Sequence, residues 1–112
     1  DVIRQGLSDL ISREHRLEVV GQATTGRDAV SRCHDLRPDI VLMDVSMPDM
    51  DGISATREIR ETCSDTRVIA LSMYDDLETR ELMLQAGASH FVTKSDPPES
   101  LVRLLLRLTA SR

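Results

Sequence analysis

Aromatic residues are nearly absent from this sequence of 112 residues. Tryptophan is missing, and Tyr74 and Phe91 supply the whole aromatic content of 2%. We therefore expect no stacking surface for single-stranded nucleic acid or sugars. Basic residues are outnumbered as well, with 14 lysines and arginines against 19 acidic residues and a net charge of −5. Because contacts to phosphates need clustered Lys and Arg, this segment is not expected to bind DNA directly.

Long apolar runs and a secretory leader are also lacking. The longest apolar runs span a few residues, such as residues 40–43, whereas a transmembrane helix needs about 20. No basic segment followed by an apolar stretch opens the sequence. We therefore expect a cytoplasmic protein with no membrane partner. Cys33 and Cys63 have no metal-ligand spacing and are predicted to be reduced, mostly buried thiols.

The residues that are present indicate one compact α/β domain. The sequence is 40% hydrophobic and 29% charged, which is typical of a soluble globular domain. Apolar residues recur at helical spacing in some segments and form short continuous runs in others. Helices are predicted at residues 2–11, 26–36, 53–61, 77–86 and from 96 onwards, and strands at 17–22, 39–43, 68–71 and 90–93. Strands that alternate with helices predict a doubly wound parallel sheet with helices on both faces.

Three polar residues stand where predicted strands end: Asp44, Ser72 and Lys94. Ligands of such sheets bind at the carboxyl ends of the strands. Each residue alone has an ordinary explanation as a turn former, a helix cap or a solvated charge. Together they suit a phosphoryl acceptor site. The carboxylate takes the group as an acyl phosphate, the ammonium and a divalent cation neutralise its charge, and the hydroxyl bonds its oxygens.

Three ordered segments resemble one known family. Residues 39–52 (DIVLMDVSMPDMDG) strongly resemble the phosphoacceptor segment of response-regulator receiver domains. Residues 70–76 and 86–94 match the two later signatures of that family in order and spacing. Within this family, the sequence most resembles the NarL/FixJ subfamily, which has a LuxR-type output domain. That resemblance lies in residues 4–7, 17–23, 72–76 and 94–95. The likeness covers essentially the whole sequence and implies the flavodoxin-like, CheY-like (βα)5 fold.

The resemblance implies a role for each matching residue. Asp44 would be phosphorylated by a sensor histidine kinase, and Lys94 and Ser72 would bind the phosphoryl oxygens. Ser72 and Phe91 would form the switch, in which the aromatic side chain follows the hydroxyl. Asp44 and the backbone carbonyl of Ser46 would be ligands of Mg²⁺. Apart from Mg²⁺-dependent self-phosphorylation from a phosphodonor, no enzymatic activity is expected.

The resemblance also implies partners and further segments. Phosphorylation is expected to promote a homodimer, either through the surface around residues 77–86 and 90–93 with the last helix, or through the first and last helices. A helix-turn-helix output domain is expected beyond Arg112, and DNA would be bound only through it, to control transcription. Residues 1–112 would be the receiver domain, incomplete at its N-terminus. The family's first strand, with the acidic pair that holds Mg²⁺, should lie just ahead of Asp1.

Three explanations of the missing strand stay open. The sequence is part of a longer molecule, which we favour; or it is truncated and repaired by a swapped strand or another packing; or it is a receiver that has lost its metal site. Two other functions compete with the phosphorylated receiver. A phosphatase of the haloacid dehalogenase type would need an acid/base aspartate where Ser46 stands. The main alternative is a degenerate, receiver-like protein-interaction module that is not phosphorylated.

Overall fold

The computed structural model describes residues 11–17, 21, 23, 25–45, 52–72, 76–93 and 96–110. Within these ranges helices and strands alternate. Their order along the chain is α2 (Gly26–Leu36), β1 (Ile40–Asp44), α3 (Gly52–Thr62), β2 (Arg67–Ser72), α4 (Leu77–Ala86), β3 (His90–Thr93) and α5 (Pro98–Ala110).

The predicted elements are confirmed from residue 26 onwards. The bounds of α2, α4 and β3 are as predicted, and those of the other elements differ by one or two residues. The predicted helix at residues 2–11 and the predicted strand at 17–22 lie mostly outside the described residues.

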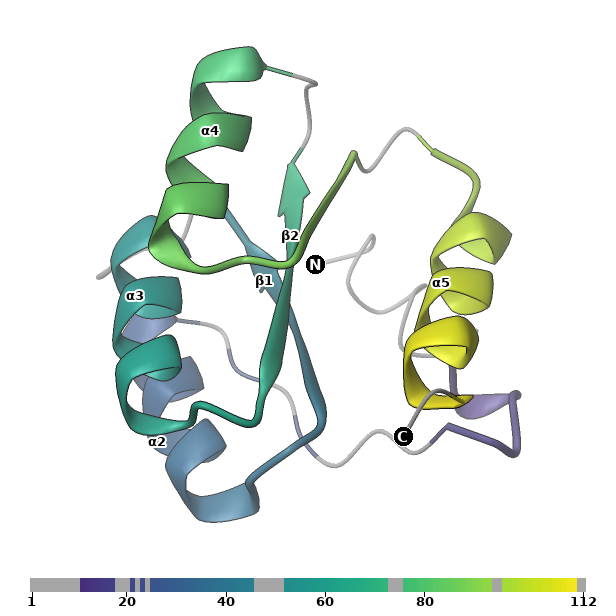
Figure 1. Ribbon diagram of the computed structural model, residues 1–112. Helices are drawn as coiled ribbons and strands as arrows, with labels where there is room; N and C mark the ends of the chain where they lie inside the picture. Colours follow the sequence, from purple (N-terminus) through teal and green to yellow (C-terminus); the bar gives the residue numbers. More distant parts are fainter. Residues whose placement is uncertain are drawn as a thin grey trace.

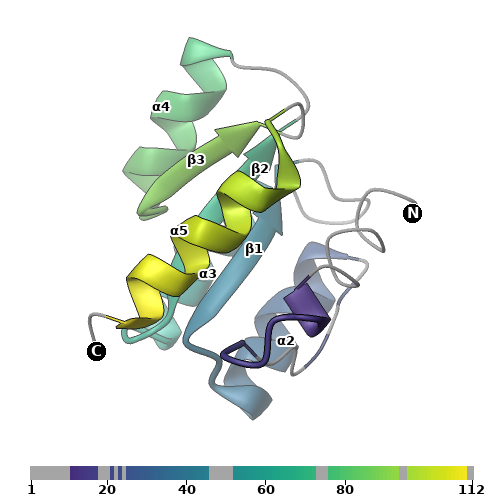
Figure 2. The same ribbon diagram turned by 90° about the vertical axis from the view of Figure 1, so that its right-hand side faces the viewer.

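The three described strands form one parallel sheet in the order β1-β2-β3. In this register, Asp44 of β1 pairs with Leu71 of β2, and Ser72 pairs with Thr93 of β3. The strands therefore end at nearly the same level. Figures 1 and 2 show α2, α3 and α4 on one face of the sheet and α5 on the other. Helices on both faces of a parallel sheet confirm the predicted doubly wound fold.

Local signals explain where the helices begin and end. The side chains of Thr25 and Asp76 cap α2 and α4, and each accepts a hydrogen bond from a backbone N–H in the first turn. Helix α4 ends at Gly87, whose φ of 118° is easy only for glycine. Helix α2 ends at Leu36 and is capped by Arg37, which is in the left-handed region one residue before Pro38. The sequence had indicated both ends, from the glycine and the proline.

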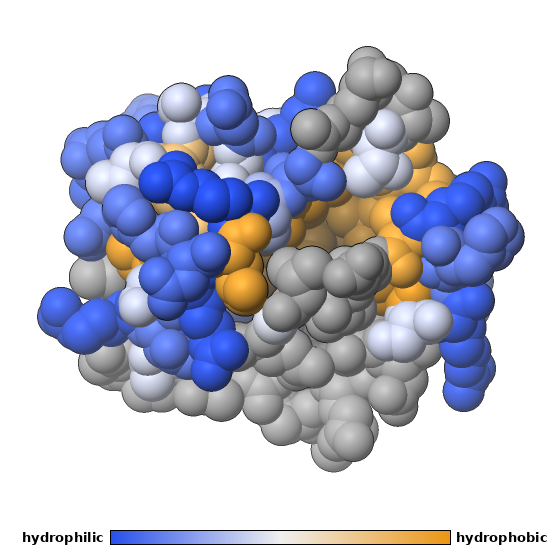
Figure 3. Space-filling view, turned by 90° about the horizontal axis from the view of Figure 1, so that it is seen from below, coloured by the Kyte–Doolittle hydropathy of each residue, from blue (hydrophilic) through white to orange (hydrophobic). Residues whose placement is uncertain are grey.

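Two hydrophobic clusters lie on opposite faces of the sheet. The α3 cluster fills the side of α2, α3 and α4, and its buried residues are Ala29, Cys33, Met43, Ala55, Ile59, Cys63, Val68, Ala70, Met83 and Ala88. The α5 cluster fills the other side, and its buried residues are Ile11, Ile69, Leu71, Leu101 and Leu105. Strand β2 supplies both clusters alternately because successive side chains of a strand point to opposite faces. Figure 3 shows the hydrophobic side chains gathered on the inner side of α5, with hydrophilic ones outside.

Strand β1 is less buried than predicted. The continuous apolar run predicted a strand buried on both faces, but on β1 only Met43 is fully buried, whereas Ile40, Val41 and Leu42 are partly exposed. Within the described residues, β1 has a strand partner on one side only, because β2 occupies the middle of the three strands. Residues 68–71 of β2, by contrast, are all buried, as predicted.

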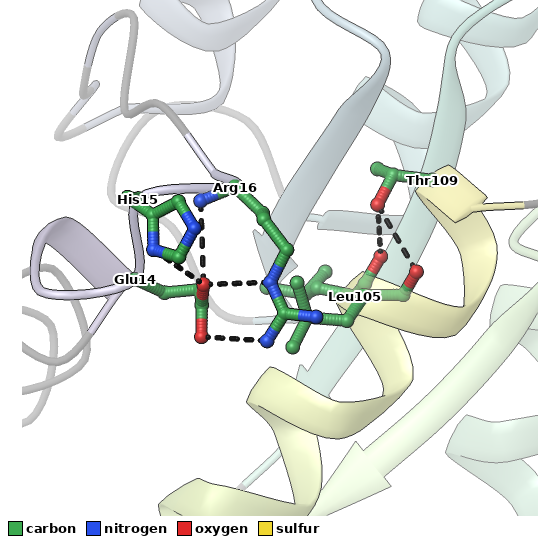
Figure 4. Close-up of polar contacts among 6 residues, drawn as sticks. Glu14, His15, Arg16, Leu105 and Thr109 are labelled. Carbon is green, nitrogen blue, oxygen red and sulfur yellow. Dashed lines mark hydrogen bonds and ion pairs between the residues drawn. The ribbon is translucent and has the colours of Figure 1, made fainter.

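The short segment at residues 11–17 packs against α5. Ile11 belongs to the same cluster as Leu105, and Figure 4 shows the neighbouring turn beside this helix. In the turn, Arg16 donates to Glu14 through Nε at 2.9 Å and Nη2 at 3.2 Å. These hydrogen bonds, and the charge of Arg16, lower the pKa of Glu14 from 4.5 to about 2. The turn is therefore held by an ion pair on the surface and by an apolar contact beneath.

Two further predictions concern the cysteines and the membrane. Cys33 and Cys63 are free and buried, as predicted. None of the helices in the described part of the chain has the length and apolar character needed to cross a bilayer.

Candidate functional site

The carboxyl ends of the strands bring together two of the predicted site residues. Asp44 is the last residue of β1, and Ser72 is the last residue of β2. Because Asp44 pairs with Leu71, Ser72 lies one residue beyond the level of Asp44 on the adjacent strand. The N–H of Val45 donates to the carbonyl of Leu71 at 3.0 Å, which continues the pairing just past Asp44. A half-buried carboxylate residue and a half-buried hydroxyl residue therefore end two adjacent strands of the sheet.

The predicted switch residues share one face of the sheet. Phe91 pairs with Ala70 in the register of β2 and β3, and its side chain packs against the α3 cluster, to which Ala70 belongs. Ser72 follows Ala70 by two residues along β2, so it points to the same face. A displacement of the Ser72 side chain can therefore reach the Phe91 ring without crossing the sheet.

Two other predicted residues cannot be placed. Lys94, the predicted phosphoryl-binding cation, and Ser46, the predicted carbonyl ligand of Mg²⁺, lie outside the described residues. Among the residues that are described, no group of three His, Cys, Asp or Glu side chains could hold a metal ion. Asp44 is the carboxylate residue that the described strand ends offer to a cation.

Helix α3 begins directly against the end of β1. The N–H of Gly52 donates to the carbonyl of Val45 at 2.7 Å. A Cβ atom on residue 52 would collide with the carbonyl oxygen of Asp44 and lie only 2.8 Å from the Cα of Val45. These neighbours are backbone atoms, which cannot move aside without displacing the strand end. The absence of a side chain at Gly52 is therefore what lets the helix start beside Asp44.

Sequence reasoning had only partly identified Gly52. The Asp-Gly step at residues 51–52 predicted a backbone held close to a ligand. The structure shows that the close neighbour is the backbone of Asp44 and Val45.

A cation that sequence reasoning missed lies over the predicted switch aromatic. The guanidinium carbon of Arg80, on α4, is 4.9 Å from the centroid of the Phe91 ring. Nothing in the sequence pattern pairs these residues, because they lie on different elements that only the fold brings together. Spacing on α4 can show which face a residue occupies but not which strand residue it meets.

The fold and the strand-end site define a doubly wound α/β domain with an aspartate beside a serine at the carboxyl edge of its parallel sheet. Comparison with protein families matches residues 1–106 to the response regulator receiver domain. The transcriptional regulatory protein YhcZ of Bacillus subtilis (strain 168) is 42% identical over 102 residues, which cover 91% of this chain and 48% of YhcZ. The chain belongs to the response regulator receiver domain family.

Solved structures agree with this assignment. The signal receiver domain of the putative response regulator NarL from Mycobacterium tuberculosis superposes with a TM-score of 0.91 at 30% identity, over 99% of this chain and 90% of that one. The BeF3-activated DrrB receiver domain gives a TM-score of 0.80, also at 30% identity, over 96% of this chain and 90% of that one. The predicted family, its NarL-type relatives and the CheY-like fold are thus confirmed. The chain spans about half the length of the curated relatives it matches.

Proposed function

We propose that this receiver domain accepts a phosphoryl group on the carboxylate of Asp44 from a sensor histidine kinase. The observation that carries the proposal is the position of Asp44 at the carboxyl end of β1, with Ser72 beside it on β2 and α3 starting directly against it. Membership of the receiver family supports the same assignment. In two-component systems the phosphoryl group then acts as the signal.

The transfer exchanges one bond to phosphorus for another. A carboxylate oxygen of Asp44 attacks the phosphorus, the bond from phosphorus to the donor breaks, and the donor leaves with the electron pair. The donor is the phosphohistidine of the kinase, or a small acyl phosphate that reacts without it. The hydroxyl of Ser72 donates to an oxygen of the new acyl phosphate, and the ammonium of Lys94 neutralises part of the remaining negative charge.

We propose Mg²⁺ as the cation of this site, with Asp44 and the backbone carbonyl of Ser46 among its ligands. Mg²⁺ binds through one or two carboxylates, phosphate oxygens and water, so an aspartate at the edge of the sheet fits as one ligand. The ion, when bound, neutralises charge on the phosphoryl oxygens. The acidic pair expected ahead of Asp1 would supply further ligands in a longer chain.

Phosphorylation would control the formation of a homodimer. Charge added at Asp44 favours an arrangement in which Ser72 turns toward the phosphoryl group and Phe91 follows. We propose that the altered surface around α4, β3 and α5, or around the first helix and α5, then forms a homodimer. On this reading residues 1–112 are the receiver part of a longer cytoplasmic regulator. A helix-turn-helix domain beyond Arg112 would bind DNA and control transcription.

Intact mass spectrometry tests the phosphorylation directly. The chain is incubated with acetyl phosphate and Mg²⁺, and the mass is compared before and after. We expect wild type to gain the mass of one phosphoryl group and Asp44→Asn to gain none. Asp65→Asn is the matched control, because Asp65 is an exposed aspartate in the turn between α3 and β2. Labelling of Asp44→Asn to the wild-type extent would refute the proposal and would favour the hypothesis of an interaction module that is not phosphorylated at this residue.

A further inference from the structure

Helix α4 carries a cation over the one phenylalanine of the chain. The guanidinium carbon of Arg80 lies 4.9 Å from the centroid of the Phe91 ring. A guanidinium within about 6 Å of an aromatic centroid is attracted to the face of the ring. The same ring packs against the α3 cluster, which includes Ala70 and Met83. The orientation of Phe91 is therefore stabilised by apolar contacts with the core and by attraction to a cation.

The first turn of α4 fixes the base of the arginine. The N–H of Arg80 donates to the carbonyl of Asp76 at 2.9 Å. The side chain of Asp76 caps the helix and also accepts from the hydroxyl of Thr79 at 2.8 Å. Because the cap holds this turn, the backbone position of Arg80 is fixed. Only the rotamer of its side chain then decides whether the guanidinium lies over the ring.

In the proposed switch, Phe91 is the residue that would transmit the conformational change away from the phosphoryl site. It lies on the same face of the sheet as Ser72, one strand away. Any interaction that favours one ring orientation therefore changes the energy of the switch, even though it does not touch the phosphoryl group. Arg80 provides such an interaction.

We propose that Arg80 is a positioning residue for the Ser72–Phe91 switch, and that its cation holds the Phe91 ring against the α3 cluster in the unphosphorylated domain. This inference rests on the proposed function of Asp44 and Ser72. Movement of the ring with Ser72 breaks the contact with Arg80. Loss of the cation then shifts the populations of the two ring orientations by about two- to fivefold, the range for a cation–π contact at a partly exposed site.

The single phenylalanine allows a direct test by NMR. Phenylalanine labelled with ¹³C in the ring places the label at Phe91 alone and leaves its charge distribution unchanged. Ring spectra are recorded for wild type, Arg80→Gln and Arg80→Lys, each before and after treatment with acetyl phosphate and Mg²⁺. Arg57→Gln is the matched control, since Arg57 is an exposed arginine on α3. Thermal melts of each variant establish that it is folded.

We expect the ring signals of unphosphorylated Arg80→Gln to move toward the positions that phosphorylated wild type shows. Arg80→Lys keeps a cation and should lie between Arg80→Gln and wild type, and Arg57→Gln should coincide with wild type. If the substitution only destabilised the domain, it would lower the melting temperature without moving the ring signals toward the positions of phosphorylated wild type.

Three results would overturn the inference. One is an Arg80→Gln spectrum identical to that of wild type, and another is an equal displacement in Arg57→Gln. The third is a displacement in a direction unrelated to phosphorylation. Failure of the proposed function is recognised separately, as a wild type that gains no phosphoryl group on Asp44. In that case a displaced ring in Arg80→Gln would show the cation–π contact, but the role of Arg80 in a switch would be refuted.

Discussion

Replacement of Gly52 by alanine tests how closely the start of α3 approaches the end of β1. The new methyl group would collide with the carbonyl oxygen of Asp44, and it would lie 2.8 Å from the Cα and 2.9 Å from the carbonyl oxygen of Val45. Real Cβ atoms do not approach other atoms so closely, and backbone atoms at a strand end cannot rotate away. The end of β1 and the start of α3 therefore have to separate.

The magnitude follows from two opposing effects. Overpacking of this kind costs about 1–3 kcal/mol. Alanine recovers up to about 1 kcal/mol, because it restricts the unfolded chain more than glycine and favours the helix. We expect a net loss of about 1–2 kcal/mol in the free energy of unfolding, which lowers the melting temperature by roughly 4–12 °C in a domain of this size. The displaced strand end should also slow phosphorylation of Asp44.

The assay compares Gly52→Ala with Gly21→Ala. At Gly21 the added methyl group would meet the Cδ1 of Leu36, the far end of a flexible and exposed side chain. We therefore expect little change in Gly21→Ala. Thermal unfolding and the initial rate of labelling by acetyl phosphate are measured for both variants and wild type. A Gly52→Ala variant as stable and as rapidly labelled as wild type would show that this contact does not position Asp44.

Three further predictions concern single side chains on different parts of the fold. Ser72→Ala should still be labelled by acetyl phosphate but should show less phosphorylation-dependent dimerisation by light scattering; an undiminished dimer would contradict the role of the hydroxyl. Thr56→Val should raise the free energy of unfolding by about 1 kcal/mol in urea titrations, because the buried Oγ1 of Thr56 has no hydrogen-bond partner in the described structure; a lower stability would mean that the hydroxyl is satisfied. Burial, together with the neighbouring Cys63, raises the pKa of the Cys33 thiol from 9.0 to about 11. The stability that the protonated Cys33 thiol contributes should be complete below pH 9 and lost as the pH rises to about 11. Because the thiol is buried and protonated at pH 8, rapid alkylation of Cys33 in the folded chain at that pH would contradict its burial.

Elements with strong local signals were predicted closely. Helix α4 has the predicted bounds because Asp76 can cap its first turn and Gly87 can adopt the left-handed conformation after its last one. The apolar run of β2 predicted a buried strand, and residues on both of its faces do enter a core. Asp44 and Ser72 were placed correctly at the sheet edge, since parallel strands all end on the same side.

Tertiary contacts could not be predicted in the same way. The collision that excludes a side chain at Gly52 involves backbone atoms of Asp44 and Val45, and the sequence pattern does not show which atoms the start of α3 approaches. The contact between Arg80 and Phe91 depends on how α4 packs over β3. The partial exposure of β1 likewise depends on what lies beside the strand, whereas hydrophobicity reports only that its residues prefer burial.

Chemical trapping of the phosphorylated residue tests the central claim most directly. Borohydride reduces an acyl phosphate to an alcohol and leaves free carboxylates intact, so an aspartyl phosphate becomes homoserine. The chain is treated with acetyl phosphate and Mg²⁺, reduced and digested, and the peptides are sequenced by mass spectrometry. We predict homoserine at position 44 and unmodified aspartate at the other positions. Homoserine at a different aspartate, or a labelled chain with none at position 44, would contradict the assignment of Asp44 as the phosphoacceptor.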